Sequence, residues 1–428
     1  MQNMKTKKLL IRIFKKKIYI YMFFMLFVCL ALSRFIFPET KSVFGYDQVD
    51  NAWAVKNIIV NGELPLVGMQ AKGNTGFFIG PYYYYYLVPF YLLTGMDPIA
   101  SPIIAGFTAI ISFIVTFYVV RSLFNVKMAL IALFITVFSS YILILDRVQW
   151  PVNFIVPISF LVFLSIYKIC SGSPKYILLL ASSIGFSLHI HFTSVFYFII
   201  VLLSLPLFPR TKETFKYILW SLPIFTFFIF PIVLNYYLSP QVKTTTSYLG
   251  NTFHGLHLRR VIQLAKDATI EFNGILGTPY SIYLSTVSII AAALMLFKPK
   301  KTKGKYLLLY LSAIWVLVPW IAFSTYSGEL TNYYFGLTRP IAILVFSYLV
   351  YRILELKKIA LTILVALIGL YYLGFNFMYF LSQGPVSLSK QRKETLEKVN
   401  RGERIEFTQG NPQSYLYYYY VQLKEDSK

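Results

Sequence analysis

Residues 18–37 read IYIYMFFMLFVCLALSRFIF, an apolar run with a single charge, Arg34, and this stretch decides the fold class. A helix needs roughly 20 residues to cross a hydrocarbon core about 30 Å thick, and the run is that long. It lacks a small-residue cleavage site, so we expect a retained signal anchor rather than a removed signal peptide. The residues before it are strongly basic: Lys5, Lys7, Lys8, Arg12, Lys15, Lys16 and Lys17.

Further apolar runs follow the first one along the chain. They lie near residues 99–120, 128–145, 152–167, 176–190, 194–208, 217–234, 281–297, 306–324, 340–351 and 359–380. Of all residues 57% are hydrophobic and 13% charged, whereas a soluble domain carries about 25% charged residues. The runs are unbroken rather than alternating, which excludes a β-barrel. We therefore predict an all-α polytopic membrane protein with about eleven transmembrane helices.

Residues 79–95 are also apolar, but they contain Gly80, Pro81, Pro89 and five consecutive tyrosines. If this stretch does not span, the basic N-terminus lies on the same side as the later basic clusters. Those clusters fall near residues 121–127, 168–175, 210–216, 298–305 and 352–358. Basic loops are cytoplasmic by the positive-inside rule, so the arrangement of eleven helices is favoured.

This topology divides the chain into a membrane domain, residues 1–381, and a polar tail, residues 382–428. It places two long loops, 38–98 and 235–280, and the tail outside the cytoplasm. In the tail the pattern indicates a helix over about 388–400 and a candidate strand over 415–421. Nearly all acidic residues before the tail fall on the outer side, and a catalytic face would explain this distribution.

The formal net charge of +23 raises the question of nucleic acid as a partner. The basic residues cluster at the ends of apolar runs, which is the pattern of topology signals and of contacts with anionic headgroups. We therefore expect membrane lipids, and no nucleic acid, as partners of these charges.

The first outer loop contains the most informative segment, residues 45–62, GYDQVDNAWAVKNIIVNG. Asp47 is a good N-cap residue, and Gly62 is a stop signal. Val49, Ala52, Trp53 and Ile59 form an apolar stripe, so we predict a short amphipathic helix at the membrane surface. Asp47 and Asp50 are spaced i,i+3 on one side of its first turn. From these residues alone, a helix cap with a solvated neighbour is as good an interpretation as a catalytic pair.

Several short motifs, in this order, resemble the C-type (GT-C) membrane glycosyltransferases. The similar branch contains dolichyl-phosphate-mannose protein mannosyltransferases and bacterial aminoarabinose transferases of lipid A. The motifs are residues 45–62, 62–66 (GELPL), 80–86 (GPYYYYY), 150–153 (WPVN), 188–193 (LHIHFT) and 332–340 (NYYFGLTRP), so the resemblance covers about 20–350. It implies that Asp47 is the catalytic carboxylate and that Asp50 fills a second acidic position. His191 matches a histidine of the family.

Two positions depart from the family pattern. The residue after the aspartate is usually Glu and is Gln48 here, which weakens a metal-binding interpretation. Asp146 and Arg147 stand where some relatives carry an acidic pair. No metal ligand set is therefore predicted, although the resemblance leaves a divalent cation open. His254 and His257 have i,i+3 spacing, but two ligands without a third are a weak metal signal.

Sugar transfer from a polyprenyl phosphate needs one carboxylate to take the proton of the acceptor hydroxyl. The leaving phosphate is a stable anion, so a cation that holds its charge suffices. We assign the base to Asp47. The candidate substrate-binding residues are Asp50, Lys72, Asp146, Arg147, His191, Tyr333 and Arg339, with Arg259 and Arg260 as further candidates for the phosphate. For each basic residue, snorkelling to headgroups is the simpler alternative.

The sequence thus predicts a glycosyltransferase that moves a monosaccharide from a polyprenyl-phosphate donor to a lipid, glycan or protein acceptor, with inversion implied by the resemblance. The active site would lie on the extracytoplasmic face of the cell membrane. A lipid-linked oligosaccharide flippase or other transporter is one alternative, although the apolar runs contain few of the charged residues that transport pathways use. A glycan polymerase or ligase is another, because it would share the outer-face location.

Overall fold

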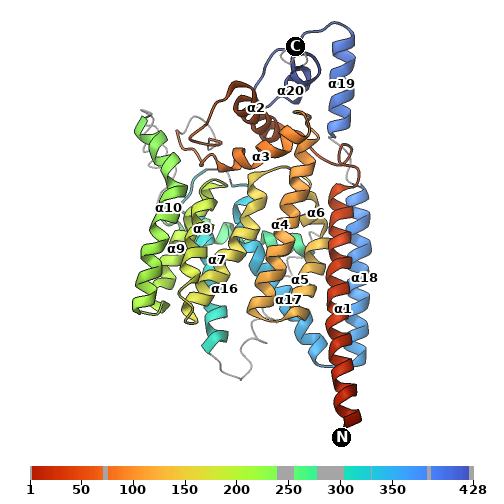
Figure 1. Cartoon of the computed structure of the whole chain (residues 1–428), viewed down its shortest axis with the longest axis vertical. Helices are drawn as coiled ribbons and strands as arrows, with labels where there is room; N and C mark the ends of the chain where they lie inside the picture. The colour runs from red at the N-terminus through yellow and green to blue at the C-terminus, as the bar shows by residue number, and fades with distance from the viewer. Residues whose placement is uncertain are drawn as a thin grey trace.

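The computed structural model is helical, and it describes residues 2–70, 76–238, 255–276, 303–328, 330–382 and 387–423. Gln70 and Phe78 form a bridge between extended segments. Figure 1 shows long helices running through the body of the molecule, with a group of shorter helices at the end opposite the N-terminus. The all-α prediction is confirmed.

Seven described helices are long and apolar enough to cross a membrane. They are α1 (Gln2–Phe35, apolar from Lys17), α4 (Ala100–Leu123), α7 (Ile155–Cys170, preceded by the 3-10 turn η1, Pro151–Phe154), α10 (Lys212–Leu238), α16 (Lys303–Phe323), α17 (Arg339–Glu355) and α18 (Ile359–Ser382). Shorter apolar helices are α5 (Val126–Phe138), α8 (Tyr176–Ser187) and α9 (Val195–Ser204). These helices coincide with the predicted runs, and the run 281–297 lies outside the described residues.

Helices α10 and α18 show that lipid is the solvent of this fold. Only 6% of the apolar window of each helix is buried inside the protein. Phe227 on α10 is 62% exposed and Tyr371 on α18 is 71% exposed. Water-soluble monomers rarely expose contiguous apolar surface of this extent. A helix can expose such a surface to lipid because its backbone groups are hydrogen-bonded within the helix. The chain is therefore an integral membrane protein.

Helices α4, α5, α7 and α17 pack against one another at the centre of the bundle. On α7, Phe160, Phe163 and Leu164 are fully buried. The buried indole of Trp315 on α16 donates to Ser159 Oγ at 2.7 Å, so its polar atom is satisfied. This helical core supports the shorter helices at the end of the molecule opposite the N-terminus (Figure 1).

Helix α2 (Tyr46–Asn61) begins and ends at glycines. Gly62 has φ 69°, the left-handed conformation that ends many helices. Asp47 was expected to be the N-cap, and this was wrong: the N-cap is Gly45, whose N–H is bound by Gln48 Oε1 at 2.9 Å. Asp47 lies one position inside the first turn, so its carboxylate does not serve as the cap.

Helix α3 (Tyr82–Leu93) contains the tyrosine run and has 12 residues. At 1.5 Å per residue it is about 18 Å long, too short to cross the membrane. The hydroxyls bond within the protein: Tyr82 donates to Phe227 O at 2.9 Å, and Tyr85 donates to Pro65 O at 2.8 Å. Tyr86 Oη lies 3.2 Å from Thr108 Oγ1. The tyrosines therefore fix α3 over the membrane helices.

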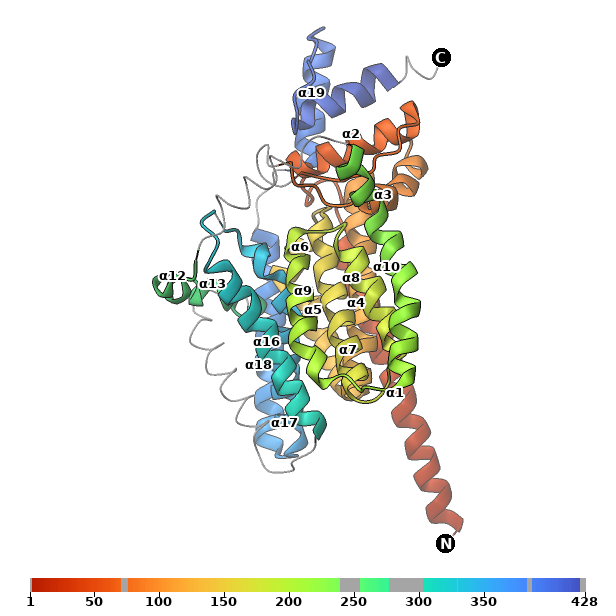
Figure 2. The same ribbon diagram turned by 90° about the vertical axis from the view of Figure 1, so that its left-hand side faces the viewer.

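The tail folds onto α2 and α3, as both views of the molecule show (Figures 1 and 2). Its first helix, α19 (Leu388–Asn400), has the predicted bounds. The strand expected over 415–421 is instead helical, as α20 (Pro412–Tyr417) and a π-helical turn, Tyr418–Gln422. Asn411 Oδ1 accepts from the Gln413 N–H at 3.0 Å, and Pro412 occupies the first helical position. These start signals outweigh the strand propensity of the tyrosines.

Candidate functional site

Asp47 lies at the start of α2, close to the indole of Trp150. Trp150 precedes η1, in the loop that connects α6 (Ser140–Leu145) to α7. Burial and the neighbouring charge of Asp50 raise the pKa of Asp47, and the indole N–H of Trp150 partly offsets this rise. A carboxylate with a raised pKa is a stronger base than a solvated one.

Gln48 explains one departure from the family pattern. It is 4% exposed, and its Nε2 donates to Gln149 O at 2.8 Å while its Oε1 accepts from Gly45. Gln149 Nε2 in turn donates to Tyr83 Oη at 3.2 Å. A glutamate at position 48 could not donate to the carbonyl, so the amide is what joins α2 to the Trp150 loop.

Tyr333 and His191 lie beside the Trp150 ring. The Tyr333 and Trp150 centroids are 4.5 Å apart and edge-on, and His191 lies 5.6 Å from Tyr333 and 5.4 Å from Tyr334. Tyr333 comes from η4 (Asn332–Thr338), and His191 from the turn after α8. The structure thus brings together Asp47, Trp150, His191 and Tyr333 from four separate segments.

His191 is a neutral residue in this setting. Burial lowers the pKa of His191 to about 4. Its Nδ1 accepts from the Thr193 N–H at 3.3 Å and lies 3.0 Å from Thr193 Oγ1. Nδ1 is therefore unprotonated, and Nε2 carries the hydrogen. At neutral pH the ring offers one N–H donor and no positive charge.

Asp50 is held by the tail. Gln409 Nε2 donates to its Oδ2 at 3.2 Å, and the Gly410 N–H lies close to the carboxylate. Burial raises the pKa of Asp50, and these two groups oppose the rise. Gly410 has φ 69°, and a Cβ there would lie 1.9 Å from the Tyr46 ring, so the close approach of the tail to α2 requires glycine.

Asp146 and Arg147 are both engaged by α1. Arg34 donates to Asp146 Oδ2 through Nη2 at 2.9 Å and Nε at 3.1 Å. Arg147 is 2% exposed and donates to carbonyls at the end of α1: Ser33 O at 2.7 Å, Ile36 O at 2.6 Å, Phe37 O at 2.9 Å and Lys41 O at 3.2 Å. Both side chains therefore hold the C-terminal end of α1, and the residues just after it, against the Trp150 loop.

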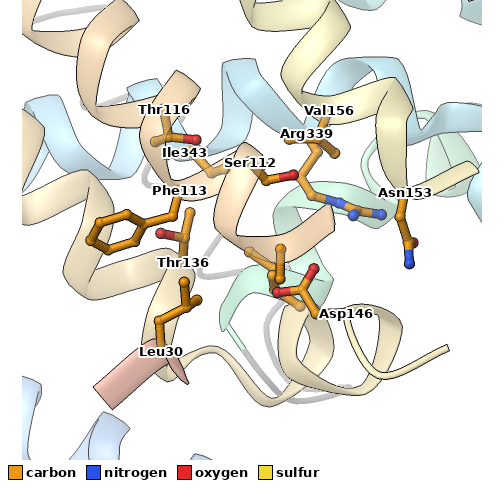
Figure 3. Close-up of a pocket in the computed structure, with 12 residues that line it drawn as sticks. Leu30, Ser112, Phe113, Thr116, Thr136, Asp146, Asn153, Val156, Arg339 and Ile343 are labelled. Carbon is orange, nitrogen blue, oxygen red and sulfur yellow. The ribbon is translucent and has the colours of Figure 1, made fainter. Parts of the chain in front are cut away.

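Arg339 forms a buried ion pair with Glu271 of α14 (Ile270–Leu276). Its Nε lies 2.5 Å from Glu271 Oε2, and its Nη2 lies 3.1 Å from Oε1. Tyr141 Oη donates to Glu271 at 3.1 Å, and the Tyr141 ring lies under the guanidinium at 5.2 Å. Figure 3 shows Arg339 and Asp146 on the wall of a cavity of about 20 Å³, which is room for one water molecule.

Lys72 lies outside the described residues, as does His254. Among the residues that are described, no three His, Cys, Asp or Glu side chains gather as a metal site would require. The two polar atoms of Gln48 are already bound within the protein.

No family model matches the chain, and no curated protein matches it in sequence. Its structure is similar to that of ArnT from Cupriavidus metallidurans bound to undecaprenyl phosphate, with TM-score 0.54, 9% identity, and coverage of 95% of this chain and 75% of that chain. It is also similar to the archaeal oligosaccharyltransferase AglB from Archaeoglobus fulgidus in complex with an inhibitory peptide and a dolichol-phosphate. There the TM-score is 0.57 and the identity 13%, over 91% of this chain and 58% of that chain.

The chain has the GT-C fold. The predicted resemblance to GT-C glycosyltransferases is thereby confirmed at the level of the fold. Two motifs that carried the resemblance meet in it, because His189 Nδ1 accepts from the Tyr82 N–H at 3.3 Å and its ring stacks on Tyr82 at 4.1 Å. A Cβ on Gly80 would lie 1.9 Å from that ring, so glycine is needed there.

Sequence reasoning missed Trp150 and Gln409 as neighbours of Asp47 and Asp50, and His189 as the partner of Tyr82. Trp150 and His189 were inside quoted motifs, but spacing along the chain did not show which side chains they would meet. Gln409 carries no motif at all. Only the docking of the tail onto α2 brings it to Asp50.

Proposed function

We propose that this protein transfers a monosaccharide from a polyprenyl-phosphate carrier to a hydroxyl-bearing lipid, glycan or protein. The observation that carries the proposal is the half-buried Asp47 carboxylate, which lies beside Trp150 on a GT-C fold. ArnT, which shares the fold, is described bound to undecaprenyl phosphate. An isoprenoid phosphate is accordingly the donor carrier that we propose here.

In the proposed reaction the acceptor oxygen attacks the anomeric carbon as its proton passes to Asp47. The bond between that carbon and the phosphate oxygen breaks, and the phosphate leaves with the electron pair. No general acid is needed, since the leaving group is already a stable anion. A positioned base of this kind contributes about 10²–10⁴-fold to the rate. The raised pKa of Asp47 supports its assignment as that base.

We assign the remaining side chains of this cluster to substrate binding. Asp50 would accept hydrogen bonds from the acceptor or from the sugar, in an orientation fixed by Gln409. The Tyr333 ring offers a face for a sugar ring, and neutral His191 offers one N–H donor. Lys72 stays a sequence-based candidate for the donor phosphate.

For Asp146, Arg147 and Arg339 we propose a structural role in place of substrate contact. The donors of Arg147 meet backbone carbonyls, and Asp146 pairs with Arg34. Arg339 shares both oxygens of Glu271. A guanidinium that is already matched to a carboxylate gives little net gain from a second anion. Their part would be to hold the loops around Asp47.

We place the active site on the extracytoplasmic face. Helix α2, which contains Asp47, lies at the end of the molecule opposite the N-terminus (Figure 1). The positive-inside rule makes the basic N-terminus cytoplasmic. The prediction of eleven helices supports the same orientation.

The test is incubation of the purified protein with a panel of polyprenyl-phosphate sugars, including one carrier with an oligosaccharide. Release of polyprenyl phosphate, together with labelled acceptor, is the expected result for at least one monosaccharide donor. A lipid-linked oligosaccharide transporter would instead move its substrate across proteoliposomes without releasing the phosphate. Transport without release would overturn the proposal.

A further inference from the structure

A second polar pocket lies at the C-terminal end of α16, where α12 (Leu258–Gln263) and α13 (Ala265–Ala268) lie close by (Figure 2). It is open and has a volume of about 400 Å³. Cationic or ionisable side chains line one wall, and hydroxyl side chains line the other. The residues that matter are His257, Arg259, Arg260, Ser324, Thr325 and Ser327.

The basic wall is fixed to the membrane helices. The Trp320 indole on α16 donates to Val261 O at 2.8 Å, which anchors the middle of α12. Leu264 and Ala268, just after it, are 3% and 2% exposed. Since α13 packs against α16, the two arginines keep their place relative to the hydroxyls of 324–327. The pocket is therefore built by the fold.

The pocket carries a net positive charge, which favours binding of an anion. None of its lining residues is acidic, and within the described part of the chain neither Arg259 nor Arg260 forms an ion pair. Arg260 Nε is buried and has no hydrogen-bond partner among the described residues. A buried donor without a partner is unfavourable, and an anionic oxygen would satisfy it.

The opposite side of the same segment is apolar and uncovered. Leu256 is 62% exposed, Leu258 74% and Ile262 68%. Basic residues on one side and exposed leucine and isoleucine on the other are the pattern of a segment at the headgroup boundary of a bilayer. The apolar side chains would contact acyl chains while the arginines remain at phosphate depth.

We propose that this pocket binds the phosphate headgroup of a membrane lipid, at a site separate from Asp47. Its lining residues do not include those that contact Asp47. Aromatic side chains in contact connect the two sites. Phe323, next to Ser324, stacks on Tyr334 with ring centroids 5.7 Å apart, and the Tyr334 centroid lies 4.9 Å from that of Tyr333. The lipid that we propose is an anionic phospholipid. A polyprenyl phosphate shares this headgroup chemistry, and its binding is the other outcome of the test. Binding needs no sugar transfer, so the inference goes beyond the proposed function.

The test is protection of Arg259 and Arg260 from phenylglyoxal, read by peptide mass spectrometry on the full-length protein in detergent. Farnesyl phosphate, dioleoyl phosphatidylglycerol and inorganic phosphate are the probes. The exposed Arg401 and Arg404 of the tail are internal controls. A saturating lipid should slow modification of Arg259 and Arg260 by about 10-fold or more, since charge-assisted bonds of this kind are worth about 1.5–3 kcal/mol. The controls should not change.

The two lipid sources give different results. Protection at lower concentration by phosphatidylglycerol than by farnesyl phosphate supports the proposal. Protection at lower concentration by farnesyl phosphate would make the pocket part of the donor site and overturn it. The proposal is also overturned if phosphatidylglycerol does not protect, or if inorganic phosphate protects at the same concentration. Arg259→Gln/Arg260→Gln should weaken lipid binding by about 10-fold or more relative to Arg401→Gln/Arg404→Gln. In the Asp47→Asn variant, lipid should protect Arg259 and Arg260 as well as it does in the wild type. The result of this test therefore does not depend on whether the proposed transferase activity is found.

Discussion

The indole of Trp150 lies beside the carboxylate of Asp47, although the two residues are about a hundred positions apart in the sequence. The indole N–H favours the charged form of Asp47, whereas burial and Asp50 favour the neutral form. Tyr333 packs edge-on against the same indole. Trp150 therefore couples the proposed base to the loop that contains Tyr333.

Trp150→Phe should move the acid limb of the pH–rate profile to higher pH. The substitution keeps an aromatic ring but removes the donor that lowers the pKa of Asp47, and transfer requires Asp47 in its charged form. Initial rates from pH 4 to pH 8 would measure the shift. Trp220→Phe, on the lipid-facing side of α10, is the control and should leave the profile unchanged. An unshifted profile for Trp150→Phe would separate Trp150 from the titration of the base.

Gln409→Ala should raise the KM for the acceptor by about 2- to 12-fold, the range that corresponds to a net hydrogen bond of about 0.5–1.5 kcal/mol. Gln409 fixes the Asp50 carboxylate, which we assign to substrate binding. Gln413→Ala is the matched control, because Gln413 bonds to Lys398 at 2.8 Å and Glu394 at 3.4 Å in the tail. If the two alanine variants had the same acceptor KM, the tail would have no part in the site.

Glu271→Gln and Arg339→Gln should each destabilise the protein by about 3–5 kcal/mol, since each leaves a buried charge without its partner. Arg352→Gln breaks the ion pair of Arg352 with Glu355. These two side chains are 44% and 40% exposed, so the variant should lose little stability. The measurement is the temperature at which half of the monodisperse protein in detergent is lost. Normal stability of Arg339→Gln with a selective rise in donor KM would instead place Arg339 at the phosphate.

A cysteine at Arg404, with Cys29 and Cys170 changed to serine, should react with a membrane-impermeant thiol reagent added to intact cells. The eleven-helix topology places the tail outside, and Arg404 is exposed there. A cysteine at Lys358, in the loop between α17 and α18, should react only after lysis. The reverse labelling pattern would contradict the predicted orientation.

Local signals in the sequence predicted the helices well. Gly62 ended α2 as expected because a left-handed residue was needed there, and the helix over 388–400 has the predicted bounds. The prediction of a strand over 415–421 was wrong, although Asn411 and Pro412 are signals for the start of a helix. The tyrosines suggested a strand, but Tyr415 and Leu416 are buried on a helix whose Tyr415 ring meets Trp53 at 5.2 Å.

Partners distant in sequence were not predictable from spacing. Arg339 and Arg147 had the right chemistry for a phosphate, but the sequence could not show that Glu271 and the end of α1 would engage them. Asp47 could be singled out, since the resemblance points to its position. Its proximity to Trp150, which depends on how α2 meets the loop before α7, could not be predicted.

Asp47→Asn should leave the fold intact and raise its stability at neutral pH. The folded-state pKa of Asp47 is raised above its usual 3.8 by burial, so its favourable contribution is present at low pH and lost as pH rises through the raised pKa. An asparagine avoids the burial of a charge and still accepts from Trp150. Thermal denaturation at pH 4 and pH 7 should show the gain only at the higher pH.

The most direct test of the account is sugar transfer by Asp47→Asn, compared with wild type at equal amounts of monodisperse protein. Asp50→Asn is the neighbouring control and should lose less activity, because Asp50 is assigned to binding. We predict that Asp47→Asn lowers the turnover by about 10²–10⁴-fold, since an amide cannot take the proton of the acceptor. Turnover of Asp47→Asn near that of the wild type would contradict the assignment of Asp47 as the base, and with it the proposed mechanism.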